Sequence, residues 1–417
     1  MSKDNWPTVR LKDITTKIGS GATPRGGKES YRSDGISLIR SLNVYDFIFS
    51  YDDLAYINDD QARQLDNVNV EKNDILLNIT GASVARCCMV PENVLPARVN
   101  QHVSIVRINP GLADPFFVYY VINSPRYKTY LLNLAQGGAT REALTKETIE
   151  NFEVPLPEFQ LQKNIARILF AYDDLIENNT RRIQILEEMA QAIYREWFVH
   201  FRYPGHEGTC MVLSDVGELP KGWEVVNLED VCRRITDGSH ASPASVDNGF
   251  PMASVKDMTN WDFDIRTCRI ISESDYQKLV KNDCMPLLGD VVIAKDGSYL
   301  KHIFVIQEQR EMVILSSIAI LRPNEKISSQ YLALHLLDPS VKSRMAGYVS
   351  GAALPRIILK DFRKFKILLP KANILQDFTN LVAPLFQLCF KLTKENANLR
   401  QQRDLLLPRL ISGEIEL

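Results

Sequence analysis

Residues 158–200 read EFQLQKNIARILFAYDDLIENNTRRIQILEEMAQAIYREWFVH. Taken from Ile165 in alternating steps of four and three, the positions form a mostly apolar ladder, and the residues between them are mostly charged or polar. The ladder consists of Ile165, Leu169, Tyr172, Ile176, Asn179, Ile183, Leu186, Ala190, Ile193 and Trp197. This heptad spacing predicts a long helix whose apolar stripe must pack against a partner.

A second ladder of the same phase supplies a partner within the chain. Each of its positions follows its counterpart by 213 residues: Phe378, Val382, Leu385, Cys389, Leu392, Asn396, Leu399, Arg403, Leu406 and Leu410. Two such seams predict two long helices packed as an antiparallel coiled coil. Pro384 lies inside the second ladder, so we expect that helix to kink or restart there. Asn179, Asn396 and Arg403 occupy seam positions, where polar residues fix register at some cost in stability.

The two ladders belong to a larger internal repeat. Matching segments follow one another in both halves, with offsets that shrink from 217 to 213 residues, and the clearest matches are Trp6 with Trp223, Asp74 with Asp290, and Arg107 with Arg322. The chain is therefore predicted to be a duplicated unit with pseudo-two-fold symmetry. The predicted segments are a first module (1–157), a spacer helix (158–200), a Gly- and Pro-rich linker (201–222), a second module (223–370) and a C-terminal spacer helix (371–417).

Each module combines strand and helix signals. Short apolar runs at 73–80 and 99–108, and their equivalents in the second module, read as buried strands bounded by turn residues. Residues 115–134 and 328–345 carry apolar side chains at helical spacing. The predicted fold class is α+β, with two similar globular modules and two long helices.

Composition limits the classes of protein that fit. The chain has 417 residues, 45% of them hydrophobic and 24% charged, which predicts two or three globular domains. The net charge is only -2, so a nucleic-acid binder fits only if its basic footprint is local. Seven cysteines without a Cys-x-x-Cys pair, no signal core and no apolar run of membrane-spanning length predict a cytoplasmic protein.

Catalytic motifs fail when tested individually. A phosphate-binding loop would need a glycine where Ala22 stands before Gly27-Lys28, and a hydroxyl residue where Glu29 stands. The six histidines lack metal-ligand spacing, and the sequence holds no Gly-x-Ser-x-Gly elbow. We expect no catalytic residues, no metal site and no bound cofactor on this chain.

The nearest approach to a metal nuclease is Asp290 with Lys295 and Asp296. The first module has Ile79 and Thr80 at the places of Lys295 and Asp296, so a duplicated catalytic site is not supported.

The lack of catalytic motifs, together with the internal repeat, favours a binding function. The composition of the loops fits nucleic acid as the ligand. Arg, Lys, Asn, Gln, Ser and Thr on Gly-rich loops reach phosphates and base edges. The candidate DNA-binding residues of the first module are Thr23, Arg25, Lys28, Arg40, Ser41, Asn43, Thr80, Arg86, Asn100, Gln101, His102, Thr140 and Arg141. Those of the second are Ser239, His240, Ser254, Lys256, Lys295, Asp296, Ser316, Ser317 and Arg356. Equivalent positions differ in type, which indicates two different half-sites.

Two other classes of function remain open at this point. One is a stand-alone enzyme that modifies or cleaves DNA, which the missing motifs disfavour. The other is a coiled-coil scaffold that binds only proteins.

Several short segments, in a fixed order, carry a resemblance to a known family. They are Leu156-Pro157 and Leu369-Pro370 before the two helices, EWFVHFRYPGHE at 196–207, GELPKGW at 217–223, and LLPRLISGEI at 406–415. Through them the chain resembles the specificity subunit of type I restriction-modification systems along essentially its whole length.

The resemblance implies two target recognition domains that each read part of a split double-stranded DNA site, with the paired helices setting the gap. It implies two methyltransferase subunits and restriction subunits as partners in a phage-defence complex, with S-adenosylmethionine, ATP and Mg bound by those partners alone. It also makes Trp197 and Phe198 candidates for contacting a methyltransferase subunit. Arg403, on its seam position, is a further candidate to face a partner.

Overall fold

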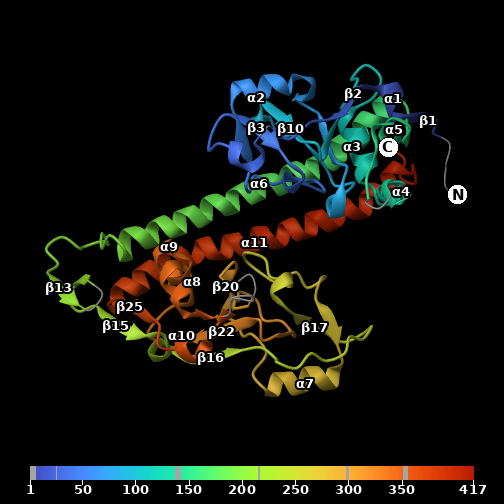
Figure 1. Cartoon of the computed structure of the whole chain (residues 1–417). Helices are drawn as coiled ribbons and strands as arrows, with labels where there is room; N and C mark the ends of the chain where they lie inside the picture. Colours follow the sequence, from blue (N-terminus) through green and yellow to red (C-terminus); the bar gives the residue numbers. More distant parts are fainter. Residues whose placement is uncertain (1–5, 25, 137–141, 215–216, 297–299, 351–355) are drawn as a thin grey trace. The chain divides into compact units, whose positions relative to one another are not determined.

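The computed structural model describes residues 6–24, 26–136, 142–214, 217–296, 300–350 and 356–417 (Figure 1). Three of the predicted DNA-binding residues, Arg25, Thr140 and Arg141, lie outside the described residues, as does the side chain of Lys28. The chain divides into two compact units. Unit 1 contains Met1–Glu177 together with Ala397–Leu417, and unit 2 contains Asn178–Asn396.

Two long helices contribute to both units. They are α6 (Phe159–Phe198) and α11 (Ala372–Ile411), each of 40 residues, coloured green and red in Figure 1. In unit 1, Ile165 and Leu169 of α6 share a core with Leu407 and Leu410 of α11. In unit 2, Trp197 and Ala190 share a core with Phe378 and Cys389. The start of each helix therefore meets the end of the other, which confirms the antiparallel pairing.

The heptad ladders are confirmed position by position, because every residue in both ladders is buried or half-buried. The prediction at Pro384 was a kink or a restart, and the restart is wrong, since α11 runs without interruption through this residue. Pro384 lies on the exposed side of the helix, while Val382 and Phe386 beside it are fully packed. Burial of these neighbours offsets the roughly 3 kcal/mol that an interior proline costs a helix.

The module of unit 1 contains two small sheets. The first is antiparallel, in the order β2 (Thr15–Ser20), β11 (Val103–Ile108), β8 (Ile75–Asn78) and β9 (Cys87–Met89). The second has the order β6 (Ala55–Ile57), β3 (Ile36–Ile39), β10 (Ala97–Val99) and β7 (Asn69–Val70), with β10 parallel to β3. Two ribbons complete it: β1 (Thr8–Arg10) with β12 (Glu153–Pro155), and β4 (Val44–Tyr45) with β5 (Ile48–Phe49).

The helices of this module are short, and α3 packs its apolar residues into the core between the sheet and α6. The helices are α1 (Leu11–Ile14), α2 (Asp59–Gln64), α3 (Pro115–Asn123), α4 (Pro125–Gln136) and α5 (Lys146–Glu150). Asp114 caps α3 by accepting a hydrogen bond from the amide of Phe117, with Pro115 at the first helical position, as the preferences for helix starts predict.

The module of unit 2 repeats this plan. Its antiparallel sheet has the order β16 (Cys232–Asp237), β22 (Ile318–Pro323), β19 (Val291–Ala294) and β20 (Ile303–Val305). Its second sheet has the order β18 (Arg269–Ile271), β17 (Phe250–Ala253) and β21 (Val313–Ile314), with β21 parallel to β17 as β10 is to β3.

The remaining elements of unit 2 are ribbons and short helices. The ribbons are β13 (Met211–Ser214) with β14 (Gly217–Pro220), β15 (Glu224–Asn227) with β25 (Lys366–Leu369), and β23 (Val349–Ser350) with β24 (Arg356–Ile357). The helices are α7 (Glu273–Lys281), α8 (Ser329–Leu337), α9 (Pro339–Met345) and α10 (Leu359–Phe362).

A duplicated ion pair stabilises equivalent turns in the two modules. Arg107 contacts both carboxylate oxygens of the fully buried Asp74 at 2.7 and 2.8 Å, and Arg322 contacts those of Asp290 at 2.8 and 2.9 Å. Each carboxylate also accepts an amide hydrogen from the turn before its strand. The same geometry at matched positions confirms the internal repeat.

Candidate nucleic-acid interface

Loops at the ends of β2, β8 and β10 bring predicted DNA-binding residues together in unit 1. The hydroxyl of Thr23 donates to the side-chain carbonyl of Gln101. The amide nitrogen of Gln101 lies 3.2 Å from Nε2 of His102, whose Nδ1 lies 2.6 Å from the hydroxyl of Thr80. These four side chains form the unit 1 polar cluster, with Gln101 and Thr23 exposed to solvent.

The backbone beneath the unit 1 polar cluster is fixed by close packing. The amide of Gly21 donates to the carbonyl of Asn100 at 3.1 Å, and a Cβ at Gly21 would lie 1.7 Å from the carbonyl oxygen of Val99. Asn100 is buried, and its side-chain oxygen accepts the amide hydrogen of His102 at 3.0 Å. Asn100 therefore shapes the turn that presents Gln101 and His102.

Arg40, Ser41 and Asn43 lie on one short turn. The polar groups of Arg40 and Asn43 form hydrogen bonds within unit 1. Asn43 is fully buried, and its amide donates to the carbonyls of Ser50 and Asp52. Arg40 donates to the carbonyl of Asp53. This turn has a structural role in unit 1.

Arg86 is half-buried, with its guanidinium 4.8 Å from the ring centre of Tyr45. A guanidinium stacked on an exposed aromatic ring keeps its donors available at the surface.

The corresponding loops of unit 2 gather a charged cluster. Lys295 is buried, and its ammonium lies 2.6 Å from a carboxylate oxygen of Asp237 and 3.9 Å from one of Asp296. Nε2 of the exposed His240 lies 3.5 Å from the other oxygen of Asp237. Lys295, Asp237, Asp296 and His240 form the unit 2 charged cluster.

Backbone bonds hold the other predicted residues around the unit 2 charged cluster. The amide of Ser316 donates to the carbonyl of Ser239 at 2.9 Å, and the amide of Lys295 donates to the carbonyl of Ser317 at 2.8 Å. Arg356 pairs with Asp296 through an isolated antiparallel bridge, and its side chain is exposed. Seven of the nine predicted residues of the second module therefore lie together.

Asp237 was not among the predicted residues, although it opens the Asp-Gly-Ser-His loop at 237–240. It borders a cleft of about 500 Å³ that is also lined by Ser239, His240, Lys278 and Asn282. The signal that was available is the matched change from Ser20 and Ile79 in the first module to Asp237 and Lys295 in the second.

Ser254 and Lys256 belong to a separate turn. The hydroxyl of Ser254 donates to Asp257 at 2.9 Å, which caps the turn Val255–Asp257. Lys256 is exposed.

The three predicted partner-binding residues lie inside their own units. Trp197 and Phe198 are buried, with ring centres 5.8 and 4.7 Å from that of Phe378. Arg403 is buried against Asp173, to which it donates a hydrogen bond of 2.5 Å. These contacts account for the burial of all three side chains.

Metal ligands do not gather in the described part of the chain, where no three His, Cys, Asp or Glu residues are placed to share an ion. Asp290 was the nearest candidate for a nuclease carboxylate, and both of its carboxylate oxygens accept hydrogen bonds from Arg322. Among the described residues, none of the helices combines the length and apolarity of a membrane span.

Comparisons with known proteins agree on one family. The family model described as "Type I restriction modification DNA specificity domain" matches residues 3–188 and again residues 220–398. The type I restriction enzyme MjaIX specificity subunit of Methanocaldococcus jannaschii is 26% identical over 419 residues, covering 99% of this chain and 94% of the relative. The HindI specificity subunit of Haemophilus influenzae is 24% identical, covering 99% of this chain and 100% of the relative.

The fold is also similar to a solved structure. The S subunit of a type I restriction-modification system from M. genitalium superimposes with a TM-score of 0.58 at 18% sequence identity, covering 98% of this chain and 97% of that one. At this identity the likeness concerns the fold alone.

Proposed function

Since the chain belongs to the type I restriction-modification specificity family, we propose that it is the non-catalytic subunit that selects the DNA sequence for such a complex. Each module reads one half of an asymmetric, bipartite site in double-stranded DNA. The complex acts in the cytoplasm, where its DNA targets are found.

The observation that carries this proposal is the combination of a shared scaffold with different loop ends. The antiparallel sheets of the two modules have matching strand orders, yet Ser20 and Ile79 of one module correspond to Asp237 and Lys295 of the other. Side chains at loop ends are the part of such a scaffold that reaches base edges, so different side chains select different bases. An asymmetric site follows, because a palindromic one would require identical ends.

The proposed DNA contacts are the accessible members of each set. In unit 1 they are Thr23, Thr80, Arg86, Gln101 and His102, and in unit 2 His240, Lys256, Ser316 and Arg356. Lys295 is buried and supports these residues through its pairing with Asp237. Arg25, Lys28, Thr140 and Arg141 remain part of the proposal on composition alone. Asn43 and Asn100 support the backbone of these loops.

The long helices are proposed to fix the gap between the half-sites. A helix of 40 residues extends for about 60 Å. Two half-sites on one face of DNA lie about 34 Å apart, or a multiple of it. A rod of this length is long enough to hold two modules at that separation.

The proposed partners are two methyltransferase subunits and the restriction subunits, which would bind S-adenosylmethionine, ATP and Mg. Exposed apolar side chains on α6 and α11 are the proposed docking positions, because covering them with a partner would remove apolar surface from water. They include Phe170, Leu175, Ile185 and Met189 on α6 and Leu381 and Leu405 on α11, each between 40 and 63% exposed. They replace Trp197, Phe198 and Arg403 as the proposed docking residues.

The test is a binding selection from random duplex DNA, with the full chain assembled with its cognate methyltransferase subunits. We expect enrichment of one split sequence with two different halves and a fixed gap. The chain alone is expected to bind weakly, since its net charge is -2 and affinity for DNA scales with the phosphates neutralised. An assembled complex without any bipartite preference would contradict the proposal.

A further inference from the structure

One turn in each module reaches the long helices of its own unit. In unit 1 it follows the short turn Ser41–Asn43, and in unit 2 it follows Val255–Asp257. Phe47 lies four residues after Asn43, as Trp261 lies four residues after Asp257. Both turns are closed by antiparallel pairing, of Val44 with Phe49 in one and of Met258 with Phe263 in the other. The two aromatic residues therefore occupy equivalent positions in the repeat.

In unit 1 the aromatic residue is covered by an arginine from α11. The guanidinium carbon of Arg403 lies 3.7 Å from the ring centre of Phe47. Arg403 also pairs with Asp173 of α6, and Asp173 accepts a hydrogen bond of 2.7 Å from the hydroxyl of Tyr120 in α3. Burial raises the pKa of the Asp173 carboxyl, and Arg403 opposes that effect. The turn, both helices and the module core thus meet at one buried charge pair.

In unit 2 the aromatic residue contacts both helices directly. The indole nitrogen of Trp261 donates to the carboxylate of Glu187 in α6. Its ring lies edge-on to Phe386 of α11, with the ring centres 5.0 Å apart and the planes at 80°. Trp261 is buried, so this contact fixes the place of the turn on the helix pair.

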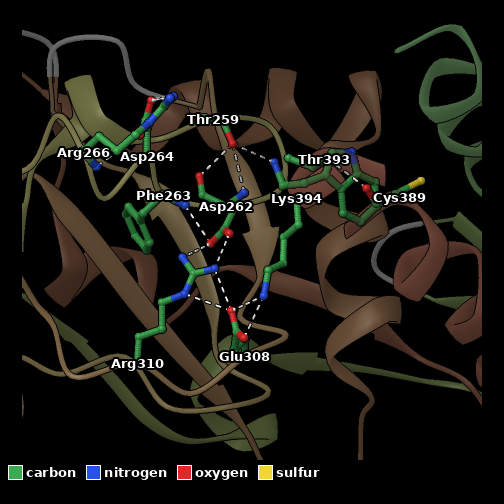
Figure 2. Close-up of polar contacts among 11 residues, drawn as sticks. Thr259, Asp262, Phe263, Asp264, Arg266, Glu308, Arg310, Cys389, Thr393 and Lys394 are labelled. Atoms are coloured by element: carbon green, nitrogen blue, oxygen red, sulfur yellow. Dashed lines mark hydrogen bonds and ion pairs between the residues drawn. The ribbon is translucent and has the colours of Figure 1, made fainter. Parts of the chain in front are cut away.

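A chain of ion pairs beside Trp261 continues to α11, as Figure 2 shows. Arg310 donates to the two carboxylate oxygens of Asp262 at 2.9 and 2.6 Å, and to Glu308 at 3.0 and 2.8 Å. Lys394 of α11 donates to both oxygens of Glu308 at 2.8 and 3.0 Å. The bond from Lys394 lowers the pKa of Glu308, while burial raises the pKa of Asp262.

These contacts are suited to fixing the orientation of the module relative to the helix pair, as well as its position. Two-point pairing of a guanidinium with a carboxylate is directional, and it loosens when either group rotates. The side chains of Arg310 and Asp262 are 23% and 17% exposed, so solvent screens their pairing less than it screens a surface pair. An apolar contact alone would allow the module to rock on the helix pair.

We infer that these contacts orient each module on its helix pair and thereby restrict the gap length that the chain accepts. The contacts are made by the turn carrying Phe47 in unit 1 and, in unit 2, by the turn carrying Trp261 together with the Asp262–Arg310–Glu308–Lys394 chain of ion pairs. These residues act through the orientation of the module and do not touch DNA. The inference rests on the proposed function. It adds a second determinant of the gap to the length of the helices.

A purely stabilising role for the same contacts makes a different prediction. Loss of stability would lower the amount of folded complex and reduce methylation of all sites alike. Loss of orientation would change the ratio between sites that differ only in the gap. The ratio of methylation rates therefore separates the two roles.

The experiment uses the full chain in complex with its methyltransferase subunits. The half-sites selected by the wild-type complex are placed in a DNA library with the native gap and with gaps one base pair shorter or longer. The variants are Arg310→Met, which removes the centre of the chain, and Lys394→Met, which changes only a half-exposed side chain and leaves the module core intact. The matched control is Arg266→Met, because Arg266 pairs with Asp264 on its own loop (Figure 2).

We expect the wild type and Arg266→Met to prefer the native gap by roughly a factor of ten or more, the effect of about 1.4 kcal/mol. Arg310→Met and Lys394→Met are expected to narrow that ratio to within about threefold, with the bases of both half-sites unchanged. Folded variants that keep the wild-type ratio would overturn the inference while leaving the proposed function intact. A wild-type complex that accepts all gaps equally would overturn both. Should Arg310→Met fail to fold, Lys394→Met decides the question alone.

Discussion

The hydroxyl of Tyr194 in α6 lies 2.7 Å from Nδ1 of His335 in α8, within the core of unit 2. His335 is buried, and its Nε2 has no hydrogen-bond partner among the described residues. Burial lowers the pKa of His335 from 6.5 to about 3, so the folded protein holds the imidazole neutral.

The pH dependence of stability follows from this shift. Because the folded pKa is below the unfolded one, the full stability is present above pH 6.5 and is lost as the pH falls toward 3. The free energy of unfolding that is lost through His335 approaches about 5 kcal/mol near pH 3, at 1.36 kcal/mol per pKa unit. We expect urea unfolding at pH 5 to show a clearly less stable unit 2 than at pH 7. In His335→Gln the difference between the two pH values should shrink, and an unchanged difference would exclude His335 as its source.

The repeated ion pair predicts matched losses of stability in the two units. Asp74→Ala leaves the largely buried Arg107 with the half-exposed Glu71 as its remaining carboxylate partner, and Asp290→Ala leaves Arg322 with Asp283. Each change is expected to destabilise its own unit by about 3–5 kcal/mol in chemical denaturation. Asp60→Ala is the control, since Asp60 and its partner Arg63 are both exposed, and it should cost under about 1 kcal/mol. Equal effects of the buried and exposed changes would contradict this account.

Gly19, near the end of β2, and Gly21, just after it, provide a direct comparison. A Cβ on Gly21 would lie 1.7 Å from the carbonyl oxygen of Val99, whereas one on Gly19 would meet no atom within 4 Å. Gly21→Ala should displace the turn that carries Gln101 and His102 and cost about 1–3 kcal/mol or more. We expect the assembled complex to lose selectivity at one half-site only, as read by binding selection. Gly19→Ala should bind like the wild type, and equal selectivity of both variants would remove this role for Gly21.

The Asp237–Lys295 pair predicts a non-additive pair of substitutions. Lys295→Ile alone leaves the Asp237 carboxylate, 18% exposed, without its ammonium partner. The double change Asp237→Ser with Lys295→Ile copies Ser20 and Ile79 of the first module and removes both charges. Thermal and urea unfolding should show the double variant to be more stable than Lys295→Ile by about 1–3 kcal/mol. A double variant that is less stable than either single one would show that the pair is not coupled in this way.

Sequence periodicity was sufficient to predict the helices and the repeat. The heptad ladders place each of their residues on a buried stripe, and recurrence of Asp74 and Arg107 as Asp290 and Arg322 marks a turn with the same geometry. The family resemblance, and not periodicity, made Trp197 and Phe198 candidates for a partner surface. Both rings lie against Phe378, far away in the sequence, a contact that periodicity does not reveal.

The polar contacts were much harder to predict. Arg310 and Asp262 are 48 residues apart, and Lys394 lies 86 residues from Glu308. Pairs between loops leave no periodic trace in the sequence, because any exposed loop carries similar residues. Asp237 was overlooked for a related reason, since its matched change with Lys295 gains meaning only from the contact between the two side chains.

The composition of unit 1 also determines the order in which the chain can mature on the ribosome. Leu407, Leu410 and Ile411 fill the same core as Leu11, Phe117 and Ile165, so the module of unit 1 lacks part of its interior until residue 411 has been synthesised. Unit 2 is one continuous stretch, and its core is complete once residue 396 has left the exit tunnel. The module of unit 1, made before unit 2, is therefore completed after it, and its apolar surface stays open to chaperones in the meantime.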